Sequence, residues 1–458
     1  MITTQYRSSP GIMIASLPSN PVIHLRMRES DILFVHRYFP GQFRLLSAYL
    51  AARHRVVALR DAQFDEAVPA GLRCLSYQAA PASGSTHRYV RSLEGAVRRG
   101  QAVARAALAL RSRGFRPRII FAHPGWGEAL YLKDVFPDAK LVGLFEFFYR
   151  AEGADVGFDP EFPARLDDRL RLRTRNAVNL MSLEACDWGV SPTVWQRNLH
   201  PVAFWPRLSV IHDGIDTDRV RPDLSARLVT PTGETLSLDD EVVTYVARDL
   251  EPYRGFHSFM RALPLILSRR PRARVVIVGG DGTSYGPPPA AAACWREHLL
   301  AELGSRLDLS RVIFLGRVPY DTYLRVLQIS SVHVYLTYPF VLSWSCLEAM
   351  AAGCAVVGSA TAPVEEVIVD GVNGLLVDFF SPRAIADAVA SVLDHPDRMA
   401  AMRAAARRTI VDRYDFHRVC LPRYLALVDR LLGTARKPSK HQPVTQPVPS
   451  QASVAFAP

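Results

Sequence analysis

The sequence has little of what metal sites, disulfide scaffolds and membrane spans need. Its six cysteines are scattered, with no Cys-x-x-Cys pair and no His-rich neighbour at metal-ligand spacing, so we expect reduced thiols and no metal. No apolar run reaches the roughly 20 residues that cross a bilayer. The first thirty residues lack the continuous apolar segment of a signal peptide, so we expect a cytoplasmic protein.

What is present is the composition of a large globular chain with excess positive charge. Of the 458 residues, 49% are hydrophobic and 22% are charged, and the formal net charge is +11. This apolar content is enough for two or three domains with buried cores. The charge favours an anionic partner but does not identify one.

Much of this charge lies between Arg88 and Arg118, where Glu94 is the only acidic residue. The spacing of the apolar residues predicts a basic amphipathic helix. Three interpretations stay open: a solvated face, peripheral contact with an anionic membrane on its inner face, and binding to a phosphate polymer. Because no nucleic-acid motif accompanies the helix, we expect no nucleic-acid partner.

Strand and helix patterns alternate along the chain, which is typical of an α/β protein with parallel sheets. The predicted parts are a loose extension over 1–29, a first domain over 30–210, a second domain over 211–415, a helix over 416–433 that returns to the first domain, and a disordered tail over 434–458. The first domain is expected to include one helix over residues 166–185. We expect two Rossmann-like, doubly wound domains facing across a ligand cleft.

Two arginines follow the first predicted strand of the second domain, in RDLEPYRG. Arg248 and Arg254 there suit a diphosphate, because guanidinium groups bind phosphate oxygens bidentately and a helix begins nearby. The alternative is that both are surface arginines paired with Asp249 and Glu251. The turn VIVGGDG, which contains Gly280, is a weaker ligand signal because it lacks the dinucleotide-binding spacing.

A single carboxylate, Glu348, lies in the apolar stretch YPFVLSWSCLEAMAAGCAVVGS. Ser343 is a good N-cap for a helix that contains Glu348, Gly353 is suited to its C-terminal end, and a buried strand follows. Because a buried carboxylate is costly without a partner, the stretch predicts a polar ligand. The alternative is a half-exposed Glu interacting with the helix dipole.

Five segments in this order resemble the C-terminal domain of the family 4 (group 1) retaining glycosyltransferases, which have the GT-B fold. The segments are IHDGIDTDRV, VARDLEPYRGFHSFMRAL, RVVIVGGDG, RVIFLGRVPYDTYLRVL and CLEAMAAGCAVVGSATAPVEEVIVDGVNGLLVD. The resemblance covers roughly residues 210–432. The first domain matches more loosely, through HRYFPGQF, AHPGWGE and GVSPTVWQRN.

The resemblance implies donor-site roles for five residues of the second domain. Glu348 would accept hydrogen bonds from the ribose diol of a nucleotide-sugar, and Arg248 would bind its diphosphate. Arg254 stands where the family usually has a lysine. Backbone groups near Val318 would contact the base, and the backbone of Ser343 would approach the sugar and β-phosphate.

The resemblance also implies roles in the first domain. Gly41 and Gln42 belong to the loop that would approach the diphosphate, and His123 matches the histidine that faces the reacting sugar. The nearby stretch EFFYRAEGADVGFDPE carries Glu146, Glu152, Asp155 and Asp159. This acidic stretch either borders the acceptor site or is a solvated loop.

One position departs from the family pattern. The family usually has a second Glu, which touches the transferred sugar, eight positions before Glu348, and this chain has Phe340 there. A phenyl ring accepts no hydrogen bond from a hydroxyl in that way. Three interpretations follow: a donor sugar held differently, a deoxy or less polar donor sugar, and a protein that has lost catalysis.

The function implied is transfer of a sugar from a nucleotide-diphospho-sugar to a saccharide or lipid-linked acceptor hydroxyl with retention of configuration, in cell-surface polysaccharide or glycolipid synthesis. The candidate catalytic residues are His123, Arg248 and Arg254, which act without a cofactor or metal because arginines neutralise the leaving phosphate. Two alternatives are a sugar-nucleotide epimerase of the same fold and a non-catalytic nucleotide-sugar-binding subunit of a membrane-associated complex.

Overall fold

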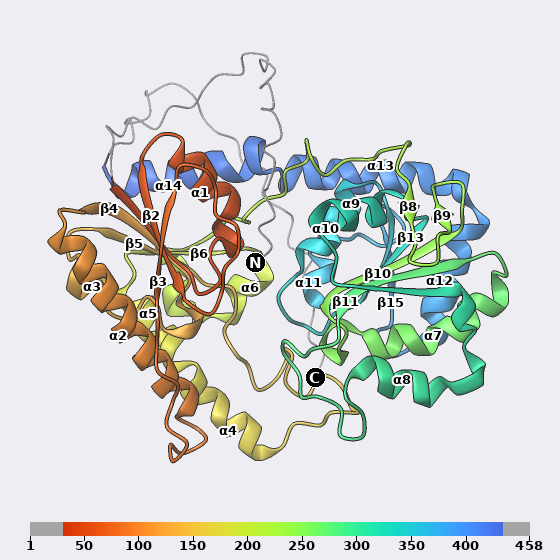
Figure 1. Ribbon diagram of the computed structural model, residues 1–458, viewed down its shortest axis with the longest axis horizontal. Helices are drawn as coiled ribbons and strands as arrows, with labels where there is room; N and C mark the ends of the chain where they lie inside the picture. Colours follow the sequence, from red (N-terminus) through yellow and green to blue (C-terminus); the bar gives the residue numbers. More distant parts are fainter. Residues whose placement is uncertain (1–30, 434–458) are drawn as a thin grey trace, which may run out of the picture.

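Two separate parallel sheets organise the chain, and each forms the centre of one lobe in the computed structural model (Figure 1). The structure describes residues 31–433. The extension expected over 1–29 and the tail expected over 434–458 lie outside the described residues. Within residues 31–433, no helix is both long enough and apolar enough to cross a bilayer.

The first lobe holds a seven-stranded sheet in which each strand is parallel to its neighbours, in the order β3-β2-β1-β4-β5-β6-β7. The strands are short runs rich in branched residues, such as DILFV in β1, which suits a sheet covered on both faces. The strands are β1 (Asp31–Val35), β2 (Arg55–Asp61), β3 (Arg73–Tyr77), β4 (Pro117–Ala122), β5 (Lys140–Leu144), β6 (Trp188–Ser191) and β7 (Leu208–Val210).

Helices cover both faces of this sheet. Apolar residues of α1 pack on one face, and those of α2, α3 and α5 pack on the other. The α-helices are α1 (Arg44–Ala51), α2 (Arg91–Ser112), α3 (Leu132–Val135), α4 (Leu166–Arg175), α5 (Ala177–Ala185) and α6 (Val194–Leu199). The short 3₁₀ segments are η1 (Gly41–Phe43), η2 (Pro124–Trp126) and η3 (Val202–Arg207).

The helix expected over residues 166–185 is two helices, α4 and α5, which meet at Asn176. The Asn176 side chain accepts a hydrogen bond from the backbone N–H of Tyr149 and donates one to its carbonyl. These two bonds tie the break between the helices to the segment that follows β5. The expectation of a single helix was therefore wrong, because a side-chain anchor between the two helices is not encoded in their periodicity.

The second lobe holds a six-stranded parallel sheet in the order β12-β11-β10-β13-β14-β15, with a small antiparallel pair, β8-β9, beside it. All four residues of β13 and all five of β14 are buried. The strands are β8 (Leu228–Val229), β9 (Thr235–Leu236), β10 (Val242–Asp249), β11 (Arg274–Gly280), β12 (Val312–Gly316), β13 (Val332–Tyr335), β14 (Ala355–Ser359) and β15 (Leu375–Val377).

Helices again cover both faces. Residues of α7, α8 and α12 pack on one face, and those of α9, α10 and α13 pack on the other. The α-helices are α7 (Phe256–Arg269), α8 (Trp295–Leu303), α9 (Tyr320–Gln328), α10 (Trp344–Ala351), α11 (Ala362–Glu365), α12 (Pro382–Asp394), α13 (Pro396–Arg413) and α14 (Leu421–Leu431). The shorter segments are η4 (Pro252–Arg254), η5 (Gly304–Arg306), η6 (Leu309–Arg311) and η7 (Phe416–Cys420), of which η7 is a π-helix.

The end of the described chain returns to the first lobe. After α13, the segment η7 and helix α14 pack on the core of the first sheet, with Phe416, Tyr424 and Leu425 buried against residues such as Phe121. In Figure 1 the blue α14 lies on the same lobe as α1. The returning helix therefore adds a second covalent crossing between the lobes.

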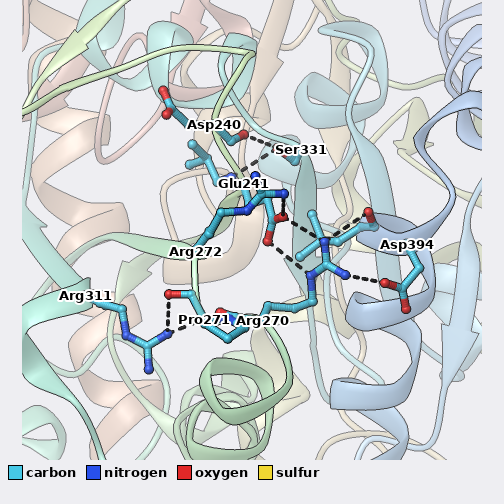
Figure 2. A network of polar contacts seen from close by, with 10 residues as sticks. Asp240, Glu241, Arg270, Pro271, Arg272, Arg311, Ser331 and Asp394 are labelled. Carbon is cyan, nitrogen blue, oxygen red and sulfur yellow. Dashed lines mark hydrogen bonds and ion pairs between the residues drawn. The ribbon is translucent and has the colours of Figure 1, made fainter.

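A network of charged residues lies at the amino ends of the second sheet (Figure 2). Arg270, at the end of α7, binds Glu241 with two nitrogens at 2.7 and 3.1 Å and also pairs with Asp394 at the end of α12. Arg311 donates to the last carbonyls of α7 and the turn after it, including those of Leu267 and Arg270. These contacts fasten helices to the sheet at the end away from the ligand-binding edge, so we assign the network a structural role.

Candidate functional site

The carboxyl ends of the two sheets meet at the interface between the lobes. The guanidinium carbon of Arg248, at the end of β10, lies 5.6 Å from the ring centre of Tyr38, which follows β1. On the second lobe, Glu366 accepts the backbone N–H groups of Val194 and Trp195 at the start of α6, at 2.8 and 2.7 Å. Such contacts place the loops after the strands of both sheets against one another.

A cavity of ≈ 340 Å³ lies between the lobes. Its lining comes from Gly41, Gln42, Arg44, Leu45, Ala48, Ala67, Val68, Pro69, Asp213, Gly214, Ile215, Asp216, Arg219, Tyr320, Trp344 and Glu348. Three residues expected at the donor site, Gly41, Gln42 and Glu348, thus border one space although they come from opposite lobes. The other expected site residues do not line this cavity.

Gly41 holds the first-lobe side of the cavity in a conformation that favours glycine. Its φ is +45°, and an added Cβ would lie 2.5 Å from the His36 ring. The loop can therefore pass close to the histidine only because residue 41 has no side chain.

Glu348 is buried in α10, and its partners are two tyrosines of α9. Ser343 caps α10 as expected, since its side chain accepts the backbone N–H of Ser345. Tyr320 donates to one carboxylate oxygen of Glu348 at 2.7 Å, and Tyr323 donates to the other at 2.6 Å. Burial raises the pKa of Glu348, and the tyrosine hydrogen bonds oppose this rise. The sequence pattern did not identify these tyrosines as partners. Each carboxylate oxygen still has a lone pair that could accept a hydrogen bond from a ligand.

Arg254 is a buried cation, 8% exposed, whose hydrogen bonds go to neutral groups. It donates to the Thr337 hydroxyl and the Val341 carbonyl at 2.9 Å each, and to the Tyr335 hydroxyl at 3.4 Å. No ion pair between Arg254 and a carboxylate occurs among the described residues. The Tyr335 oxygen also accepts the backbone N–H of Ser343 at 2.8 Å, so that N–H is not directed at a ligand.

Arg248 is exposed and reaches toward the first lobe. The carboxylates proposed as alternative partners for the two arginines are engaged elsewhere. Asp249 pairs with Arg317 at 2.6 Å, and Glu251 accepts backbone N–H groups of the loop after β11. Between residues 31 and 433, no ion pair joins Arg248 to Asp249 or Glu251, which leaves its charge available to a ligand.

Gly280 and Val318 have local packing roles. A Cβ on Gly280 would lie 2.5 Å from Arg317 Nε and 2.6 Å from Asp249 Oδ1, so a side chain there would displace one of these two paired groups. Val318 is half-buried and packs against the cluster formed by β10, β11 and neighbouring residues.

Phe340 is 8% exposed and belongs to an aromatic cluster that joins the lobes. Its ring centre lies 4.7 Å from that of Phe147 in the first lobe, 4.9 Å from that of Tyr285 and 5.7 Å from that of Tyr253. The Arg254 guanidinium lies 5.7 Å from the same ring. At the position of the family's sugar-binding Glu, this chain therefore has an apolar aromatic ring packed beside the buried Arg254.

His123 ends a chain of hydrogen bonds across the first lobe. Its Nδ1 accepts the N–H of Gly125 at 3.2 Å, so Nε2 carries the proton donated to Glu146 at 3.0 Å. The other oxygen of Glu146 accepts from Gln42 at 2.7 Å, and the Gln42 carbonyl oxygen accepts from His36 at 2.8 Å. The chain joins the carboxyl ends of β1, β4 and β5.

The hydrogen bonds of this chain favour the ionised form of Glu146, which lies at its centre. Burial alone would raise its pKa, but the hydrogen bonds from His123 and Gln42 outweigh burial and lower it. Burial also holds the pKa of His36 well below its usual value. Glu146 was named in the sequence only as one acid of a stretch, because nothing in the chain order shows that it faces two residues of earlier loops.

The rest of the acidic stretch crosses to the second lobe. Asp155 accepts a hydrogen bond from Tyr253 at 3.0 Å, and Asp159 lies 2.9 Å from His257 Nε2. Glu152 is exposed. The two buried aspartates thus join the lobes, so a solvated loop is wrong for them, whereas a border of the acceptor site stays a prediction.

Two sequence families match, one in each lobe. Residues 52–220 match the family described as Glycosyl transferase family 4 group, and residues 232–409 match Glycosyl transferases group 1. The GDP-mannose-dependent alpha-(1-6)-phosphatidylinositol monomannoside mannosyltransferase of Mycolicibacterium smegmatis is 28% identical over 310 residues, which are 64% of this chain and 72% of that protein. The D-inositol 3-phosphate glycosyltransferase of Thermobispora bispora is 28% identical over 207 residues, 44% of this chain and less than half, 46%, of that relative.

Solved structures show the same fold. Sucrose-phosphate synthase from Thermosynechococcus elongatus superposes with a TM-score of 0.64 at 17% identity, covering 89% of this chain and 100% of that one. This likeness and the two parallel sheets confirm the expected fold class, two Rossmann-like α/β domains facing across a cleft in the GT-B arrangement.

Proposed function

Because the chain belongs to the group 1, family 4 glycosyltransferases, we propose that it transfers a sugar from a nucleotide-diphospho-sugar to a hydroxyl of a saccharide or lipid-linked acceptor. The observation that carries this proposal is Arg254, a buried guanidinium with no carboxylate partner among residues 31–433. A buried charge without a counter-ion is costly, and a diphosphate would supply the missing anion. The named relatives transfer sugars, which supports the same reading.

In the proposed reaction, configuration is retained. The acceptor oxygen bonds to the anomeric carbon on the face from which the diphosphate leaves, the bond from that carbon to the phosphate oxygen breaks, and a β-phosphate oxygen takes the hydroxyl proton. Arg254 and the exposed Arg248 neutralise the charge that develops on the leaving diphosphate. The proposal assigns no metal or cofactor to this step.

Glu348 and the Gly41 loop seat the donor in this proposal. Glu348 keeps one lone pair on each oxygen for the two ribose hydroxyls, while Tyr320 and Tyr323 hold the carboxylate in place. The backbone around Gly41 approaches the diphosphate from the first lobe. Both sides line the same cavity, which makes a ligand shared between the lobes the simplest occupant.

A panel of GDP-, UDP-, ADP- and dTDP-sugars tests the function. We expect one nucleotide class to raise the melting temperature and to be slowly hydrolysed without acceptor, with both effects lost in Glu348→Ala. Binding without turnover under any acceptor would favour the non-catalytic subunit. Release of an epimerised nucleotide-sugar with no free nucleotide diphosphate would favour the epimerase.

We also propose that α2 contacts the anionic inner face of a membrane, as enzymes of cell-surface glycoconjugate synthesis would need. Arg98 pairs with Glu94 and Arg99 donates to a backbone carbonyl, so neither is free for lipid. Arg105 and Arg113 are exposed. Binding to anionic vesicles should weaken with salt and in Arg105→Glu with Arg113→Glu, and vesicle binding unaffected by both would refute the contact.

A further inference from the structure

The sugar end of the proposed donor site has no carboxylate at residue 340. The opposite lobe has one, Glu146, which accepts a hydrogen bond from Gln42 of the cavity lining. Phe340 packs against Phe147 with ring centres 4.7 Å apart. The residue before Phe147 is Glu146. The first-lobe segment that faces Phe340 therefore also carries Glu146, whose carboxylate is bonded to Gln42 at the edge of the cavity.

His123 is poorly placed to bind a sugar in this chain. Its side chain is 6% exposed, and both ring nitrogens are engaged, Nδ1 by the N–H of Gly125 and Nε2 by Glu146. A hydrogen bond from His123 to a substrate would require breaking one of these bonds.

Glu146 has the exposure and the capacity that His123 lacks. Its side chain is 18% exposed. One oxygen accepts a hydrogen bond from His123 at 3.0 Å and the other from Gln42 at 2.7 Å, so each retains a lone pair. A buried Gln196 holds the backbone by donating to the Glu146 carbonyl at 2.8 Å. The carboxylate is thus held by two hydrogen bonds and its backbone by a third, while part of the side chain stays exposed.

We infer that Glu146 is the carboxylate that accepts hydroxyl hydrogen bonds from the transferred sugar, in place of the Glu replaced by Phe340. This inference rests on the proposed function and adds a residue to it. His123 and Gln42 act as positioning residues, since each fixes one oxygen of Glu146. His36 in turn fixes the orientation of the Gln42 amide. The transferred sugar would thus be bound from the first lobe and its nucleotide from the second.

The test compares a nucleoside diphosphate with its nucleotide-sugar on the full-length protein. In Glu146→Gln we expect unchanged affinity for the nucleoside diphosphate, whereas affinity for the nucleotide-sugar falls about 10- to 100-fold, as expected for a lost hydrogen bond to a charged group. We expect kcat/KM for the donor to fall by about 10²-fold or more. Glu146→Asp should show an intermediate loss of affinity, because the shorter side chain keeps the charge but places the carboxylate farther from the sugar.

Glu152→Gln is the matched control, because Glu152 is an exposed carboxylate in the same segment and should behave as wild type. Equal loss of nucleoside diphosphate and nucleotide-sugar binding in Glu146→Gln would indicate structural damage and overturn the inference. A change confined to the acceptor KM would overturn the assignment to the transferred sugar. If the wild-type protein binds no nucleotide, the proposed function itself is wrong. If Glu146→Gln binds the nucleotide-sugar with wild-type affinity, only the inference about Glu146 is wrong.

Discussion

Arg254 allows a direct test of whether its buried guanidinium serves to bind a diphosphate. Burying a guanidinium costs several kcal/mol. Its two good hydrogen bonds, at 2.9 Å to Thr337 and Val341, recover about 1.5–3 kcal/mol each because the donor is charged. These opposing contributions are similar in size. We therefore expect Arg254→Met to change the unfolding free energy of the unliganded protein by less than about 1.5 kcal/mol.

Binding should respond very differently. Without the guanidinium the diphosphate loses a charge-assisted contact in a water-poor site, and we expect affinity for the nucleoside diphosphate to fall by about 2–4 kcal/mol, roughly 30- to 1000-fold. Urea unfolding with and without nucleoside diphosphate measures both quantities in one assay.

Arg261 provides the matched control, because its guanidinium already pairs with Glu161 and Glu302. Arg261→Met should leave nucleoside diphosphate binding unchanged. If unliganded Arg254→Met lost more than about 3 kcal/mol while its ligand stabilisation matched wild type, Arg254 would be a structural residue and the reasoning would be wrong.

Three further predictions concern contacts around the site. Burial would raise the pKa of Asp159, but hydrogen bonds from His257 and Tyr338 lower it. The ionised carboxylate therefore stabilises the fold above the ordinary pKa of about 3.9, and this stabilisation is lost as pH falls through the folded pKa. In urea unfolding from pH 6 to 3, the unfolding free energy should fall less steeply in Asp159→Asn than in wild type, and parallel curves would contradict this. Tyr323→Phe should remove a donor to Glu348, weakening nucleoside diphosphate binding about 10-fold by calorimetry; unchanged affinity would show that the tyrosine does not prepare the carboxylate. Glu366→Gln should lower the unfolding free energy by about 1 kcal/mol, because Glu366 caps the start of α6 in the opposite lobe. Urea denaturation measures this, and an unaltered midpoint would show that the cap is dispensable.

Local patterns predicted much of the second lobe because its elements obey short-range rules. Ser343 caps α10 through its own side chain, and Gly353 after that helix has a φ of +84°. The strand β14 follows at Ala355–Ser359 and is wholly buried, as an uninterrupted apolar run suggests. Each of these features depends on residues within a few positions of one another.

Long-range partners were not predictable in the same way. The sequence indicated that Glu348 needs a polar partner, but the two tyrosines that bind it lie 25 and 28 positions earlier. Nothing in the spacing distinguishes those tyrosines from core aromatics. Glu146 was likewise one acid among four until the fold placed it between His123 and Gln42.

The sequence by itself determined the alternation of strands and helices, the two-domain α/β class and the residue types at the strand ends, because periodicity, capping and turn preferences act locally. Only the tertiary structure decided which side chains meet across the lobes. Phe340 could have faced solvent, a sugar or an aromatic cluster, and its contact with Phe147 joins positions almost two hundred residues apart. Hydrogen bonds and ring contacts act over a few ångströms of space, whatever the distance along the chain, so the composition of the site is a property of the folded molecule.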